Sequence, residues 1–226
     1  VDPTDQLLCE GELTDDVIFT GPSPTTSFIW TNDNTSIGLV ASGTGDILSF
    51  TADNTSLVDQ DATITVTPEF NGCLGNSQTF VITVKPKPNA FATPVTQEHC
   101  SGENSDEIFF TGDLVGTQYD WLNDNVSIGL SASGIGDIPS FTVINSSSTI
   151  QTSTVSVIPS FNGCDGDEIT ATIVVNPIST VVVSSGVDEY CHNDPTLDYI
   201  FNGSSGTSTY NWVNDNTSIG LPAAGT

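Results

Sequence analysis

The chain has 226 residues, of which 28 are acidic and two are basic, and its formal net charge is −26. With so little positive charge no surface can neutralise phosphate, which excludes ordinary nucleic-acid binding and attachment to an anionic membrane. Apolar residues make up 36% of the chain and alternate with polar ones, which argues against disorder. No apolar run reaches the ~20 residues of a membrane-spanning helix. The first residues do not resemble a signal peptide, so we expect any export signal to lie upstream or to have been removed.

Alternation and turn residues predict six strands in the first part of the chain, with almost no helix. Ile64 and Val66 alternate with threonine, a pattern typical of an antiparallel sheet with one solvated face. Trp30 lies on an alternating strand beside other aromatic residues, and we expect it in the core. The predicted strands are residues 15–21, 27–33, 36–42, 47–53, 62–70 and 78–86. The last two form a hairpin around the segment NGCLGN.

The whole pattern repeats without insertion or deletion. Cys9, Cys100 and Cys191 are 91 residues apart (100 − 9 = 91 and 191 − 100 = 91), and three tryptophans keep the same spacing. A fixed period of this length predicts one β-sandwich duplicated in tandem. The predicted units are residues 1–87, 88–178 and 179–226, the last being the N-terminal half of a third repeat. A half sandwich cannot bury its own core, so we expect either that the chain continues or that the missing strands come from elsewhere.

Three aligned segments carry a family resemblance. The run FIWTNDNTSIGLVASGTGDILSFTADN and its copies YDWLNDNVSIGLSASGIGDIPSFTVIN and YNWVNDNTSIGLPAAGT resemble the PKD-like repeats of very large Bacteroidota surface proteins. The closing segments FNGCLGNSQTFVITVKP and FNGCDGDEITATIVVNP resemble the same repeats. The resemblance implies tandem immunoglobulin-like (PKD-like) antiparallel β-sandwiches, export by the type IX pathway, and a place at the cell surface in adhesins, gliding-associated proteins or extracellular fibres. It implies no catalytic residues.

The motifs do not predict an enzyme. His99 and His192 each adjoin a cysteine, but they occupy different repeat positions and the first unit has neither, which argues against a metal site. The sequence favours a structural spacer or stalk of a large extracellular adhesin or filament. Its expected partners are neighbouring repeats of the same or an identical chain. The alternative is an adhesive module that recognises a surface glycan or protein through its loops, because loops on sandwiches carry recognition. No cofactor is predicted with certainty, and calcium is the only candidate.

The calcium hypothesis rests on two recurring turns, NDN and GxGD, whose oxygens are of the type that calcium prefers. The competing interpretation is that these side chains only hydrogen-bond the backbone of their own turns. The candidate ligands are Asn32, Asp33, Asn34, Asp46, Asn123, Asp124, Asn125 and Asp137.

The five cysteines, Cys9, Cys73, Cys100, Cys164 and Cys191, predict disulfides in an exported protein. Loop-closure entropy mildly favours pairing within a unit, Cys9 with Cys73. Strand parity favours pairing between units, Cys9 with Cys164, because five strand passes place Cys9 and Cys73 at opposite ends of one sandwich. A gap of roughly 20 Å would then separate the two, whereas a disulfide needs Cα atoms within about 7 Å. Parity favours the bond between units, although one miscounted short strand would reverse it.

Overall fold

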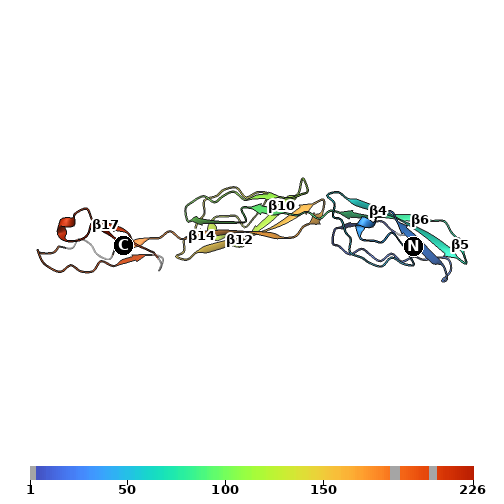
Figure 1. Ribbon diagram of the computed structural model, residues 1–226, viewed down its shortest axis with the longest axis horizontal. Helices are drawn as coiled ribbons and strands as arrows, with labels where there is room; N and C mark the ends of the chain where they lie inside the picture. The colour runs from blue at the N-terminus through green and yellow to red at the C-terminus, as the bar shows by residue number, and fades with distance from the viewer. Residues whose placement is uncertain (1–3, 184–188, 204–207) are drawn as a thin grey trace.

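The structure, a computed structural model, describes residues 4–183, 189–203 and 208–226. Three units follow one another end to end along the long axis of the molecule (Figure 1). The fold is all-β, and the helices of the described residues are 3₁₀ segments of three residues: η1 Thr35–Ile37, η2 Val126–Ile128 and η3 Thr217–Ile219. Within this part of the chain there is no helix with the length and apolar character needed to cross a bilayer.

The first unit is built on one sheet with the strand order β1-β6-β4-β2-β3, and β5 pairs with β4. The long hairpin of β4 and β6 forms its centre, where threonine and apolar residues alternate as the sequence predicts. The strands are β1 Gln6–Cys9, β2 Ser27–Asn32, β3 Ser42–Thr44, β4 Gln60–Phe70, β5 Cys73–Leu74 and β6 Gln78–Lys85.

The second unit repeats this sheet as β11-β10-β12-β14-β8, with β13 pairing β12. Its central strands begin 91 residues after their counterparts, as Gln60 and Gln151 show (151 − 60 = 91). The strands are β8 Thr96–Cys100, β10 Gln118–Asn123, β11 Ser133–Ile135, β12 Gln151–Phe161, β13 Cys164–Asp165 and β14 Ile169–Asn176. A short pair, β7 Phe91–Thr93 with β9 Phe109–Thr111, lies in the opposite layer.

Each of the first two units closes over its own core. Trp30 and Trp121 are only 6% and 7% exposed, which confirms that the repeated tryptophan faces inward. The opposite layer of the first unit is irregular and is tied together by the bridges Leu13–Thr51 and Val17–Ile47. Both layers contribute to the core, with Ile64 and Ile82 from the sheet and Ile37 and Ile47 from the opposite side.

The third unit does not bury the same positions. Ile219 is 69% exposed, whereas its counterparts Ile37 and Ile128 are fully buried. The reason is that the covering hairpin, β4 and β6 in the first unit, has no counterpart among the described residues from 179 onward. The exposure of Ile219 agrees with the expectation that a half sandwich cannot bury its own core. Its strands are β15 Val181–Val183, β16 Phe201–Gly203, β17 Trp212–Val213 and β18 Ala224–Gly225.

The expectation of purely antiparallel sheets needs one correction. Strand β1, which the sequence patterns did not predict, pairs in parallel with β6, and β8 pairs in parallel with β14. Each sheet therefore gains an edge strand at the start of the unit that runs with the last strand of the same unit. Its short sequence, QLLC in the first unit, is too brief to show an alternation.

Three of the predicted strands are largely irregular. Residues 36–42 begin in the 3₁₀ turn η1, because the Asn34 side chain caps it and Gly38 ends it with φ 93°, and only Ser42 belongs to a strand. Residues 15–21 and 47–53 make isolated bridges instead of strands. The counterpart of the first in the second unit does form strand β9, because β7 pairs with it.

Candidate functional site

The candidate site is the junction between the first and second units, where three segments distant in sequence meet. One is the hairpin loop between β12 and β14. Asn162 and Gly163 turn this loop with φ 49° and 85°, a left-handed conformation that asparagine and glycine tolerate best. The amide of Gly166 then donates to the carbonyl of Pro159 over 2.8 Å. This turn places Cys164 at the tip of the unit.

The second segment is the end of β1. Cys9 lies opposite Lys85, the last residue of β6, and its amide donates to the carboxylate of Glu12 over 2.7 Å. The parallel pairing therefore brings Cys9 beside the linker that leaves the first unit.

Cys9 and Cys164 form a disulfide across the junction, with their Cα atoms 5.6 Å apart and 155 residues between them in sequence. The pairing that strand parity favours is thus the one present. Cys73 precedes β6 whereas Cys9 pairs with its last residue. An eight-residue strand, roughly 25 Å long at ~3.3 Å per residue, therefore separates them. The number of chain passes between Cys9 and Cys73 still gives the correct pairing although some predicted strands are irregular. Each of these segments still reverses the direction of the chain once.

The third segment is the end of β6 with the linker that follows it: Lys85 ends the strand and Lys87 lies in the linker. The Lys85 ammonium donates to the carbonyl of Asn162 over 2.8 Å. The Lys87 ammonium lies 2.5 Å from a carboxylate oxygen of Asp167, whose side chain is 90% exposed. An exposed ion pair of this kind contributes about 0–1 kcal/mol. The lysines therefore orient the junction, while the covalent bond holds it.

Gly166 allows the linker to pass closely over the hairpin. A Cβ atom at this position would overlap the carbonyl oxygen of Pro88, so only glycine fits without a shift. The sequence reasoning did not identify Lys85, Lys87 or Gly166 as junction residues. The available signal was the charge pattern, because the only two lysines precede the unit whose hairpin carries Asp165 and Asp167.

The structure places the candidate calcium ligands in two separate turns. Thr44, inside the GxGD turn, pairs with Ile29, three residues before Asn32, which ends strand β2. About 10 Å of strand therefore lies between the two groups. The described residues contain no cluster of three or more His, Cys, Asp or Glu side chains suited to a metal. Calcium binding stays a prediction.

The polar atoms of these turns take part in hydrogen bonds within the unit. Asp33 accepts from the amide of Thr63, and Asp46 accepts from the amide of Phe19. Asn34 accepts from the amide of Ser36, and Asn32 accepts from the amide of Asn34. The counterparts Asn123, Asp124, Asn125 and Asp137 accept from equivalent amides in the second unit.

The remaining cysteines, Cys73, Cys100 and Cys191, are free and exposed. His99, next to Cys100, shares a hydrogen bond of 2.8 Å with the side chain of Gln97. Among the ionisable groups of the second unit, burial raises the pKa of Tyr119, and the carboxylates of Asp137 and Asp113 raise it further.

Comparison with known proteins supports the fold of the first unit. Residues 5–88 match the family described as PKD-like domain. No curated protein matches the chain.

Several solved structures are also similar, at low sequence identity. Fibronectin(III)-like modules of Clostridium thermocellum CbhA match at 14% identity and a TM-score of 0.32, covering 77% of this chain and 91% of that structure. Mouse cadherin-23 EC22–24 matches at 11% identity and a TM-score of 0.34, covering 79% and 63%. The N-terminal four Ig domains of Dscam1 match at 14% identity and a TM-score of 0.28, covering 76% of this chain. The matched region spans 43% of that Dscam1 structure. Residues 5–88 are thus similar to a PKD-like domain.

Proposed function

We propose that the chain is a spacer or stalk segment of a large extracellular surface adhesin or filament. The observation that carries this proposal is the Cys9–Cys164 disulfide, which fastens the end of one unit to the tip of the next. A bond in this position adds nothing to the core of either sandwich. Its effect is to limit bending at the junction, which is the property that a stalk requires.

Two further observations support the proposal. The units lie end to end, so that each added unit extends the molecule rather than thickening it (Figure 1). Disulfides persist in oxidising compartments, which fits a location outside the cell. PKD-like and other immunoglobulin-like domains are typically structural or binding modules, and such arrays act through length and stiffness.

The proposal is tested by negative-stain imaging of the native assembly that contains this chain. We expect a thin filament or a beaded string, with one bead per unit. The central strand β4 has 11 residues, so each bead should extend the string by roughly 36 Å at ~3.3 Å per residue. Discrete compact particles would contradict the stalk function. The alternative, a module that binds glycan or protein through its loops, would be supported if binding survived in chains of any repeat number.

A further inference from the structure

The outer face of the two-stranded sheet in the second unit carries an exposed pair of aromatic rings. Strand β7 pairs with β9 so that Phe91 lies opposite Thr111 and Thr93 lies opposite Phe109. Opposed residues of an antiparallel pair share a face, so the two rings occupy one diagonal, with Cα atoms roughly 7–8 Å apart. Phe91 and Phe109 are 57% and 47% exposed. Both rings are therefore accessible with the neighbouring units in place.

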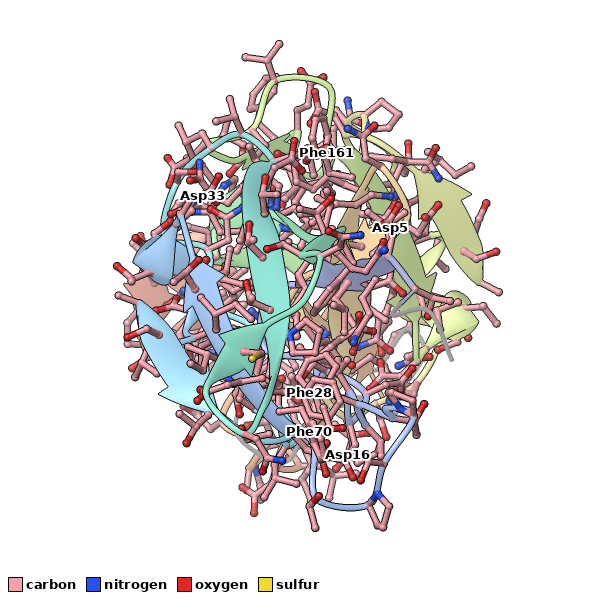
Figure 2. All side chains as sticks on the ribbon, turned by 90° about the vertical axis from the view of Figure 1, so that its right-hand side faces the viewer. Asp5, Asp16, Phe28, Asp33, Phe70 and Phe161 are labelled. Carbon is pink, nitrogen blue, oxygen red and sulfur yellow. A yellow bond between two sulfur atoms is a disulfide. The ribbon has the colours of Figure 1, made fainter. Side chains whose placement is uncertain are left out.

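A carboxylate without a partner lies next to these rings. Exposed and buried residues alternate strictly from residue 107 to residue 111, so Glu107 lies on the same outer face as Phe109. Within the described part of the chain Glu107 makes no ion pair or side-chain hydrogen bond. Its counterpart Asp16 (107 − 91 = 16) instead accepts from the amide of Ser49 over 2.6 Å. Figure 2 looks onto the first unit and shows Asp16 toward the edge of the molecule.

The rings distinguish this surface from the equivalent surfaces of the other units. The position of Phe109 is held by Ile18 in the first unit and by Ile200 in the third. The position of Phe91 is held by Val182 in the third unit. The face of an aromatic ring attracts a cation, which an aliphatic side chain does not. The second unit therefore combines two exposed rings with a free carboxylate beside them, a combination that suits a cation.

The charge of the second unit selects the same kind of partner. Residues 88–178 contain seven aspartates, four glutamates and no lysine or arginine, so the field around the unit attracts cations and repels anions. The two lysines of the chain contact this unit at the junction. A basic side chain of a partner can lay its alkyl stem along the rings. Its charged end then lies over a ring face and next to the carboxylate of Glu107.

We propose that the outer face of β7 and β9 is a docking surface for a lysine- or arginine-bearing segment of a partner protein. In the docked state a basic side chain lies against Phe91 and Phe109, and its charged end pairs with Glu107. The inference goes beyond the stalk function and does not depend on it, because it concerns the side of one unit and not the junction between units.

The test is a calorimetric titration of the full chain, with its internal disulfide formed, with a hexalysine peptide. The salt concentration is 0.15 M, at which surface charges are screened over about 8 Å. The control probe is the same peptide with every side-chain amine acetylated, which removes the charge and keeps the alkyl stems. We expect the hexalysine peptide to bind and the acetylated peptide to bind at least tenfold more weakly.

Uncharged variants separate the aromatic surface from a general attraction to an acidic protein. Phe91→Thr and Phe109→Thr leave the net charge unchanged and introduce a residue suited to a strand. Each should lower the affinity for the hexalysine peptide roughly threefold, and the double variant should lower it about tenfold. Leu122→Thr is the matched control, because Leu122 is 63% exposed on strand β10 of the other sheet. This variant should bind like the parent chain.

A second pair of variants tests the carboxylate. Glu107→Gln and Glu168→Gln each remove one negative charge from an exposed position of the second unit, but only Glu107 lies beside the rings. Glu107→Gln should lower the affinity roughly threefold more than Glu168→Gln does. Thermal melts check that each variant is folded.

Three outcomes would overturn the proposal: equal binding of the acetylated peptide, full affinity in the double phenylalanine variant, or an equal loss in Leu122→Thr. The stalk function would fail separately, through compact particles in the native assembly, and that result would leave these titrations unaffected.

Discussion

At the residue scale, asparagine and aspartate side chains supply hydrogen-bond partners for backbone groups that the short strands leave unpaired. The opposite layer of the first unit is joined by isolated bridges, so much of its backbone needs partners from outside a ladder. Asp16 accepts from the amide of Ser49, and Asp46 accepts from that of Phe19. Buried backbone groups that lack a partner cost about 1–3 kcal/mol each. The richness in Asn and Asp that suggests a ligand site therefore has a demonstrated role in holding the fold.

Asn54 provides the clearest test of this role. Its side chain is 1% exposed, and its amide donates to the carbonyls of Val58 and Val84 over 2.9 and 2.7 Å. Asn54→Ala should lower the free energy of unfolding by about 1–3 kcal/mol, because a buried carbonyl loses its donor. Thr55→Ala, at an exposed neighbouring position, is the control and should change little. Thermal melts followed by circular dichroism measure both, and equal melting temperatures would contradict the assignment.

Gly166 offers a second test, with a matched control in the same chain. A Cβ at Gly166 would meet both the Pro159 ring and the carbonyl of Pro88, whereas one at Gly75 would meet only the Pro68 ring closely. Gly166→Ala should therefore destabilise the second unit by about 1–3 kcal/mol, the usual cost of overpacking, and by more than Gly75→Ala does in the first. Differential scanning calorimetry resolves the comparison. A larger effect of Gly75→Ala would count against the close passage of the linker.

At the element scale, the sequence predicted the strands with clear alternation and missed the short strand β1. The hairpin of β4 and β6 and the tryptophan strand β2 have clear alternation, and they form as predicted. Strand β1 has four residues and owes its place to the edge of β6, a long-range pairing that local pattern does not encode. Residues 36–42 contain apolar residues at strand-like spacing, but the Asn34 cap and Gly38 favour a 3₁₀ turn. The junction partners of Lys85 and Lys87 depend on how two units meet, which only the structure reveals.

The disulfide at the junction should control stiffness rather than the stability of single units. Each unit keeps its own buried tryptophan and core, so the double variant Cys9→Ser/Cys164→Ser should still show two folded units. Without the bond, the junction retains the lysine contacts, including an exposed ion pair worth about 0–1 kcal/mol. Small-angle X-ray scattering should then show a broader distribution of molecular lengths. The variant Cys73→Ser/Cys100→Ser serves as the control and should scatter like the parent chain. Identical curves for both variants would mean that the bond does not restrain the junction.

At the scale of the whole molecule, charge and shape act together. A net charge of −26 keeps neighbouring molecules apart and opposes the compact state of each. Placing units end to end, as Figure 1 shows, lowers this repulsion because distant units hardly interact beyond the screening length. The two lysines of the chain, Lys85 and Lys87, both lie at the junction where the first two units contact each other. An acidic surface therefore suits an extended array better than a globular cluster of the same units.

This balance predicts how salts affect stability. Screening should raise the melting temperature as sodium chloride is added, because it weakens self-repulsion. Calcium chloride at equal ionic strength should do no more, since the NDN and GxGD turns lie about 10 Å apart along β2 and their carboxylates accept backbone hydrogen bonds. A calcium-binding site would instead raise the melting temperature beyond the effect of ionic strength. Calcium at 100 times its dissociation constant would add about 2.7 kcal/mol to the free energy of unfolding, or more than ~10 °C to the melting temperature of a domain of this size, and a chelator would reverse the effect.

Asp46→Asn, which keeps an acceptor for the Phe19 amide but loses the charge, is the matched control. A calcium-specific rise in the parent chain that disappears in Asp46→Asn would establish the GxGD turn as a ligand after all.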